Sequence, residues 1–245
     1  MSKFNIIKLD AIGSTNDWLK DKFFNGNCSD GDVIWVMNQT AGKGQRSKVW
    51  TSEACKNLTF SMFKHFPTLP TNQSFLINCA VTLGIVKALE KFGIPKLKIK
   101  WPNDILSANK KIGGVLIENF IKGNEFNGTI IGVGINVNQE SFDDLPYASS
   151  MILEAHTNFD LNQVLVEVLN MLSNFIEILN KLGGMNLLSD FEKNMYKKGE
   201  LSEFKSGEEI FEGKIIGVSK EGSILIEKSP TEILRYANGE IEMIY

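Results

Sequence analysis

The sequence has 245 residues, enough for one large hydrophobic core or for a large core and a small one. Apolar residues make up 43% of it and charged residues 22%, which excludes disordered, collagen-like and low-complexity proteins. The formal net charge of −3 argues against a protein whose whole surface binds nucleic acid or anionic membrane.

The first part of the chain alternates short apolar runs with helical patterns. Residues 4–9 alternate weakly and predict a strand, after which Ser14 is suited to cap a helix with Asp17 in its first turn. Asn109 to Lys111 predict a tight turn between two later strands. Further strands are expected at 33–37, 58–63, 97–101, 112–118 and 128–137, and helices at 75–92, 161–182 and 186–198.

The sequence pattern changes near residue 200, beyond which it predicts short strands and turns in place of helices. Asn238-Gly239 lies between the apolar runs 233–236 and 241–244, which is typical of a β-hairpin. We therefore expect an α+β domain with a mainly antiparallel sheet, followed by a small module resembling a β-barrel.

Four polar clusters interrupt these elements. Residues 13–16 (GSTN) also suit a plain helix cap, and 39–48 (QTAGKGQRSK) combine two glycines with three cations, which suits an anion or a solvated loop. The second cluster lacks the pattern of a Walker A loop and is a poor dinucleotide fingerprint. The third cluster is residues 100–104 (KWPND), and it continues into 110–118 (KKIGGVLIE), which contains paired glycines. The fourth is residues 131–138 (IGVGINVN), in which glycines alternate with β-branched residues. Taken alone, the fourth pattern indicates a bulged strand.

In this order the clusters resemble one family, the biotin–protein ligases, over essentially the whole chain. The KWPND and K-x-G-G-x-L-x-E sequences at this spacing are the most specific part of the resemblance. It implies a catalytic domain over residues 1–188, with a mainly antiparallel mixed sheet flanked by helices. It further implies the end of a linker helix and a small SH3-like β-barrel over residues 189–245.

The resemblance implies an ATP-dependent ligase that activates biotin as biotinyl-5′-AMP and transfers it to a lysine of a carrier. The expected partner is a biotin carboxyl carrier protein or a carboxylase biotin domain, and the enzyme is expected to be a monomer or a homodimer. Mg²⁺ is expected to be held mainly through the ATP phosphates, without a protein metal site. Because the chain starts within a few residues of its first strand, we expect no N-terminal DNA-binding domain and no nucleic-acid partner.

The resemblance also assigns residues to these steps. Lys111 would stabilise the charge that shifts as the biotin carboxylate meets the α-phosphate, and Asp104 would handle the incoming lysine. Biotin would be bound by Ser14, Thr15, Asn16, Gln39, Gly42, Lys43, Gly44, Gln45, Lys111, Gly114 and Gly132, with Gly113 and Gly134 also allowing close approach. ATP and the adenylate would be bound by Lys43, Arg46, Lys48, Trp50, Lys100, Asn103, Lys111 and Asn136.

The 42–48 loop departs from the family pattern, in which Gly-Arg-Gly-Arg is common. Lys43 keeps the charge but loses the planar fork of arginine, and Gln45 loses the charge altogether. We therefore expect loop closure to depend more on Arg46 and Lys48, and the adenylate to escape more readily.

Two alternatives stay open. A lipoate–protein ligase shares the core fold and the adenylation chemistry, although Ser14, Thr15 and Gln39 favour a polar bicyclic head group. A non-catalytic protein that binds biotin or the carrier domain would make Lys111 or Asp104 dispensable.

The cysteines and the first residues point to a cytoplasmic protein. The three cysteines include no CxxC pair, so we expect free thiols in a reducing compartment. The first residues show no signal-peptide pattern. The most apolar stretch is too short to span a bilayer, so we expect no membrane partner.

Overall fold

The computed structural model describes residues 4–142, 145–184 and 186–244, so residues 1 and 245, the outer ends of the two predicted domains, lie outside it. One sheet contains β1 (Asn5–Ile12), β2 (Asp32–Gln39), β3 (Leu58–Lys64), β4 (Leu97–Lys100), β5 (Asp104–Ser107), β6 (Lys110–Lys122) and β7 (Glu125–Ile135). A second sheet contains β8 (Leu201–Ser206), β9 (Glu209–Val218), β10 (Ile224–Ser229), β11 (Glu232–Tyr236) and β12 (Glu242–Met243). The helices are α1 (Thr15–Phe24), α2 (Phe75–Lys91), α3 (Met151–Ala155), α4 (Leu161–Leu182) and α5 (Leu187–Lys193).

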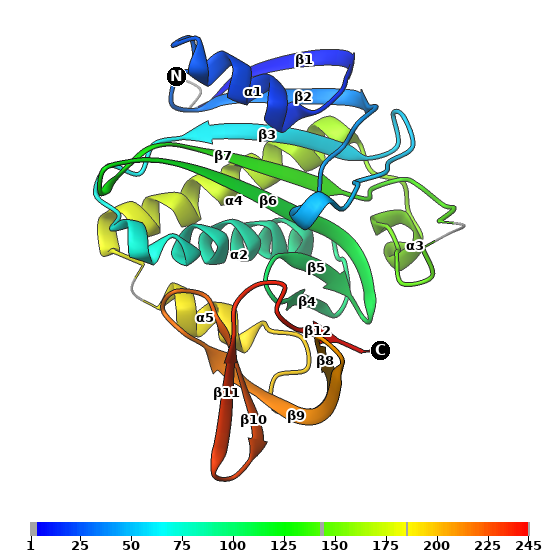
Figure 1. Cartoon of the computed structure of the whole chain (residues 1–245). Coiled ribbons are helices and arrows are strands. Elements are labelled where there is room, and N and C mark those ends of the chain that lie inside the picture. Colours follow the sequence, from blue (N-terminus) through cyan, green and yellow to red (C-terminus); the bar gives the residue numbers. More distant parts are fainter. Residues whose placement is uncertain (1–3, 143–144, 185, 245) are drawn as a thin grey trace.

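The seven-stranded sheet has the order β1-β2-β3-β7-β6-β5-β4 (Figure 1). Only β1 and β2 are parallel, and α1 connects them, because a parallel pair needs a crossover. The other neighbouring strands are antiparallel. The predicted α+β class with a mainly antiparallel mixed sheet is therefore confirmed.

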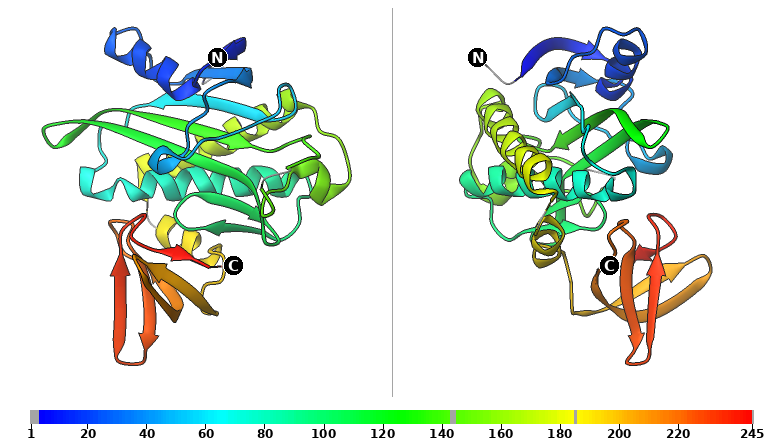
Figure 2. Two further views of the ribbon diagram at one scale, coloured as in Figure 1. Left: turned by 45° about the vertical axis from the view of Figure 1, so that its right-hand side comes forward. Right: turned by 90° about the vertical axis from the view of Figure 1, so that its left-hand side faces the viewer.

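The two faces of this sheet have different partners. Helices α2 and α4 pack against each other and lie along one face (Figure 2), over buried side chains such as Phe60 and Met62 of β3. Phe63 points to the opposite face, because side chains alternate along a strand, and it packs with Leu19 of α1. The Ser14 side chain caps α1, as predicted, by accepting a 3.3 Å hydrogen bond from the Asp17 backbone N–H.

The C-terminal module is the expected small β-module, a five-stranded antiparallel sheet with the order β11-β10-β9-β8-β12, but this sheet is not closed into a barrel. The hairpin expected around Asn238-Gly239 is wrong, because β12 pairs with β8 at the far edge from β11. The Asn-Gly pair still makes a turn, but the turn starts a crossing to the other edge. The Arg46 side chain holds this turn through its two backbone carbonyls.

Contacts from both sides hold the two sheets together. The Trp101 indole N–H, beyond β4, donates to the Gly222 carbonyl at 2.9 Å. Glu192 of α5 accepts a 2.9 Å bond from the Val218 N–H of β9 and pairs with Lys198 at 2.7 Å. The predicted domain boundary after residue 188 falls within α5 and stays a prediction.

Several predicted elements differ in detail. The turn expected at 109–111 lies at Ala108 and Asn109, between β5 and β6, because Lys110 and Lys111 are already the first residues of β6. Helix α3 and strand β5 were not expected, since each is short and β5 begins within the KWPND motif, at Asp104. In the described parts of the chain, no helix combines the length and the apolarity needed to cross a bilayer.

Candidate functional site

Two glycines of β7 form the floor of a cleft on the α1 face of the large sheet. Gly132 is paired with Ser61 of β3, and Gly134 is paired with Gly114 of β6. Because opposed residues of neighbouring strands share a face, these positions place a strip with few side chains across three strands. The strip leaves room above the sheet.

Protein side chains occupy part of that room. A Cβ on Gly132 would collide with the Asn16 carboxamide, and a Cβ on Gly134 would collide with the Trp50 indole. The sequence predicted that these glycines admit a ligand, and the structure adds that each is needed by a specific protein side chain. Gly113 contributes differently, because its Cβ would lie 3.1 Å from the Gly134 carbonyl of the next strand.

The cleft has a volume of about 740 Å³ and extends from α1 to the C-terminal sheet. It brings together every site residue that the sequence predicted except Gly42 and Gly113, which are both buried. Those lining it are Ser14, Thr15, Asn16, Gln39, Lys43, Gly44, Gln45, Arg46, Lys48, Trp50, Lys100, Asn103, Asp104, Lys111, Gly114, Gly132, Gly134 and Asn136.

One end of the cleft is a cluster of neutral hydrogen-bonding groups. The Thr15 backbone N–H donates to Gln39 Oε1 at 2.9 Å, and the Thr15 hydroxyl lies 3.1 Å from the same oxygen. The amide oxygen of Gln39 is thereby used, and its nitrogen lies beside Gly42. The Ser14 oxygen accepts the cap bond of α1, so its hydroxyl proton is left to donate.

The other end of the cleft carries a cation beside a carboxylate. Lys111 Nζ lies 2.6 Å from Asp104 Oδ1 and 5.7 Å from the centroid of the Trp50 ring. Lys111 is at the start of β6, and Asp104 is paired with Gly114 of that strand, so the sheet register brings them together. The Trp50 indole N–H is buried without a hydrogen-bond partner among the described residues.

A second lysine lies close to this pair. Lys100 is the last residue of β4 and is paired with Asp104 across the KWPND turn. Burial penalises its charged form and lowers its pKa to about 8. This lysine therefore changes charge in a pH range in which an ordinary lysine remains protonated.

The two asparagines expected near a nucleotide also hold the backbone. Asn103 donates through its side chain to the Val115 carbonyl, and Asn136 donates to the Ser149 carbonyl at 2.9 Å. Both are buried residues that line the cleft. Each bond uses one N–H of the carboxamide, which leaves the oxygen and the second N–H for another partner.

The loop from 42 to 50 closes on itself at the edge of the cleft. The Trp50 N–H donates to the Gly42 carbonyl at 3.0 Å, and the Gly44 N–H donates to the Lys48 carbonyl at 2.7 Å. The Lys43 ammonium lies 2.6 Å from the Asp17 carboxylate of α1, which raises the pKa of this lysine.

The tip of the loop binds the C-terminal sheet. Arg46 donates to the carbonyls of Asn238 at 2.6 Å and Gly239 at 2.5 Å. Gln45 Oε1 accepts from the Asn238 side chain at 2.7 Å. The loop therefore bridges both sheets, and Gln45 provides an amide contact where the family commonly has a charge.

Sequence reasoning missed the contribution of distant residues. Asn238, Lys205 and Glu242 of the C-terminal part line the cleft, although no local pattern indicated it. Glu118 stood in a recognised motif without a role, and Ser61 was not singled out. Both residues form hydrogen bonds with Asn16 at the neutral end, and each is more than 40 residues away from Asn16 in the sequence.

None of the three cysteines lines this cleft, as far as its described lining shows. All three are free, as predicted, and Cys79 is buried in α2. Burial raises the pKa of the Cys79 thiol, which leaves it protonated and unreactive at neutral pH.

Comparisons with known proteins agree with this architecture. Residues 9–136 match the sequence profile of the Biotin/lipoate A/B protein ligase family. The chain is 30% identical over 244 residues to the bifunctional ligase/repressor BirA of Escherichia coli, covering 98% of this chain and 74% of that protein. It is 28% identical over 151 residues to a biotin–[acetyl-CoA-carboxylase] ligase of Mycobacterium tuberculosis, covering 59% of this chain and 55% of that one. The structure of a biotin protein ligase from Aquifex aeolicus in complex with biotin and ATP is similar with a TM-score of 0.79 and 27% identity, covering 98% of both chains.

Proposed function

Because the chain belongs to the biotin/lipoate A/B protein ligase family, we propose that it is a biotin–protein ligase. It forms biotinyl-5′-AMP from biotin and ATP and then transfers the biotinyl group to a lysine of a biotin carrier domain. The observation that carries this proposal is a single cleft with neutral hydrogen-bonding groups at one end and the Lys111–Asp104 pair at the other.

The neutral end suits the ureido ring of biotin. This ring offers one carbonyl acceptor and two N–H donors, and it carries no charge. The Ser14 hydroxyl is free to donate, and the hydroxyl oxygen of Thr15 is free to accept. A lipoyl dithiolane has no N–H group and would leave these buried polar atoms unpaired, which is costly.

The cationic end suits the first chemical step. A biotin carboxylate oxygen attacks the α-phosphorus, a new O–P bond forms, and the bond to the pyrophosphate oxygen breaks. Two anions must meet for this attack, and the Lys111 ammonium lies at the end of the cleft where it would offset their repulsion. The Trp50 ring beside it offers a flat surface for the adenine.

Mg²⁺ enters this proposal as part of the ATP complex. Across the described residues, no three His, Cys, Asp or Glu side chains gather into a group able to hold a metal ion. The ATP phosphates would therefore supply most of the ligands of the ion, an arrangement typical of Mg²⁺. The ion supplies charge neutralisation on the phosphates when bound.

Asp104 serves the second step. The carrier amine attacks the acyl carbon, the C–N bond forms, and the C–O bond to AMP breaks as AMP leaves. The amine must lose a proton, and Asp104 is the carboxylate positioned at this end of the cleft to orient or accept it. No cysteine is required as a nucleophile.

Exchange of labelled pyrophosphate into ATP tests the choice of acid. We expect exchange that depends on biotin and is absent with lipoate or octanoate. Exchange driven by lipoate instead would support a lipoate–protein ligase. Biotin binding without any exchange would support the non-catalytic alternative.

The lowered pKa of Lys100 predicts how nucleotide use depends on pH. We propose that its ammonium binds ATP, so kcat/KM for ATP should fall as the pH rises through about 8, where the charge is lost. In Lys100→Arg the charge persists and the profile should stay flat to about pH 9, because arginine keeps its proton. Identical profiles for the two proteins would contradict this role.

The contacts at the loop tip predict how the adenylate is retained. Arg46→Ala removes two hydrogen bonds to the 238–239 turn, and we expect the adenylate to dissociate about threefold to tenfold faster. Release of labelled adenylate from a preformed complex measures this rate. Arg235→Ala is the matched control, since Arg235 is an exposed arginine of the same sheet that pairs with Glu221 outside the cleft. Equal rates of adenylate release by wild type and Arg46→Ala would show that this contact does not help to retain the adenylate.

A further inference from the structure

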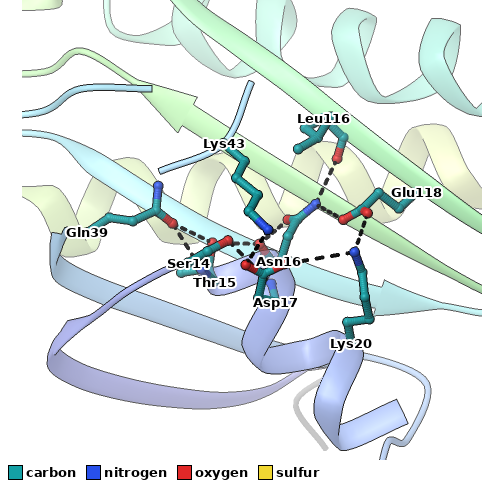
Figure 3. Close-up of polar contacts among 10 residues, drawn as sticks. Ser14, Thr15, Asn16, Asp17, Lys20, Gln39, Lys43, Leu116 and Glu118 are labelled. Atoms are coloured by element: carbon teal, nitrogen blue, oxygen red, sulfur yellow. Dashed lines mark hydrogen bonds and ion pairs between the residues drawn. The ribbon is translucent and has the colours of Figure 1, made fainter. Parts of the chain in front are cut away.

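We propose that Glu118 is a positioning residue that fixes the direction of the hydrogen bonds at the neutral end of the cleft. It acts through the Asn16 carboxamide and the Ser61 hydroxyl, and it touches no ligand itself. The inference rests on the proposed function, because the ligand whose binding it serves is the ureido ring of biotin. Figure 3 shows Glu118 of β6 reaching toward Asn16 at the start of α1.

The carboxylate determines how the Asn16 amide is turned. Glu118 Oε2 accepts from Asn16 Nδ2 at 2.8 Å, and the Leu116 carbonyl is a second acceptor at 3.5 Å from the same nitrogen. An ionised carboxylate and a carbonyl can only accept. The amide nitrogen must therefore face β6, and the amide oxygen must face Ser61.

The turned amide in turn determines the Ser61 proton. Asn16 Oδ1 lies 2.5 Å from Ser61 Oγ, and this oxygen can only accept. A serine hydroxyl has one proton, and Ser61 donates it to Asn16 Oδ1. Toward Thr15, whose hydroxyl oxygen lies 2.7 Å away, Ser61 can then only accept.

The chain ends at the atom that faces the ligand. The Thr15 hydroxyl has two protein neighbours, Ser61 at 2.7 Å and Gln39 Oε1 at 3.1 Å, and both act as acceptors. Its single proton therefore stays within the protein, whichever neighbour receives it. Thr15 presents a lone pair to the cleft, which selects a ligand with an N–H donor such as a ureido group.

Burial prevents these side chains from replacing their hydrogen-bond partners with water. Asn16 is 4% exposed and Ser61 is fully buried, so neither can exchange its partner for water. Gly132 lies directly below Asn16, where a Cβ would collide with the carboxamide. A reversed amide would turn its oxygen toward the Glu118 carboxylate and the Leu116 carbonyl, which can only accept, and such unpaired buried groups are costly.

A simpler role for Glu118 is an ion pair with Lys20, which lies 2.5 Å from its other oxygen. Both side chains are 29% exposed, and partly exposed ion pairs contribute little to stability. The two roles differ in what they predict. An ion pair affects stability alone, whereas a positioning residue affects recognition of biotin.

The test measures biotin-dependent pyrophosphate exchange by wild type, Glu118→Gln and Lys20→Met. A glutamine can donate, so the Asn16 amide is free to reverse, and we expect KM for biotin to rise about tenfold with kcat and KM for ATP unchanged. Lys20→Met removes the ion pair and keeps the carboxylate, so its KM for biotin should match wild type. Thermal melting of each variant establishes that it is folded.

A double-mutant cycle adds a second readout. Ser61→Ala breaks the chain one step later, so Ser61→Ala with Glu118→Gln should raise KM no further than the larger single effect. Wild-type exchange with an unchanged KM in Glu118→Gln would overturn the inference alone, as would equal effects of Glu118→Gln and Lys20→Met. Absence of biotin-dependent exchange by wild type would overturn the proposed function and this inference with it.

Discussion

Lys111→Ala is expected to lower the rate of biotin-dependent pyrophosphate exchange by about 10²–10³-fold, the usual effect of removing a preorganised group that stabilises a charged transition state. Lys111 is the cation that pairs with Asp104 inside the cleft, close to the Trp50 ring. Its loss leaves the biotin carboxylate and the α-phosphate to approach without a charge between them. The effect should fall mainly on kcat, because charge is redistributed during the reaction.

Lys110→Ala is the matched control for this prediction. Lys110 is the preceding residue of β6, carries the same charge, and is exposed without lining the cleft. We expect its exchange rate to equal that of wild type. If Lys111→Ala and Lys110→Ala lose activity to the same extent, the loss results from removing a positive charge anywhere at the start of β6, and the specific role given to Lys111 is wrong.

Gly132→Ala is expected to weaken biotin binding by about 10- to 100-fold, the size of effect that overpacking a filled space produces. The added methyl group would occupy the place of the Asn16 carboxamide. Asn16 must then move, and its bonds to Glu118 and Ser61 are lost together. Isothermal titration with biotin measures the affinity directly, without dependence on the later chemistry.

Gly13→Ala is a suitable control because Gly13 also lies next to the neutral end of the cleft. A Cβ there would meet only the Ala41 side chain at 4.0 Å, an ordinary contact. Its affinity for biotin should stay close to that of wild type. Retained affinity in Gly132→Ala would show that Asn16 has room to move, contrary to the tight fit described above.

The parts of the fold that the sequence predicted are those encoded locally. Ser14 caps its helix through a bond three residues away, and the 161–182 helix follows from its apolar periodicity. The wrong predictions concern pairing at long range. Asn238-Gly239 has the composition of a hairpin turn, but composition does not reveal that the next strand pairs with β8.

The same division applies to the site. The residues assigned through family motifs line one cleft, except Gly42 and Gly113. The supporting contacts were not predictable, because Asn16 and Glu118 are 102 residues apart and Arg46 and Gly239 are 193 apart. Only the folded sheet brings such pairs together, so no spacing in the sequence indicates them.

Mass spectrometry of a purified biotin carrier domain tests the central claim most directly. The carrier is incubated with this protein, ATP, Mg²⁺ and an equimolar mixture of biotin and lipoate, and its mass is then measured. The account predicts one added biotinyl group on a single lysine, formed only when ATP is present. A carrier that stays unmodified, or that gains a lipoyl group in place of biotin, would contradict it.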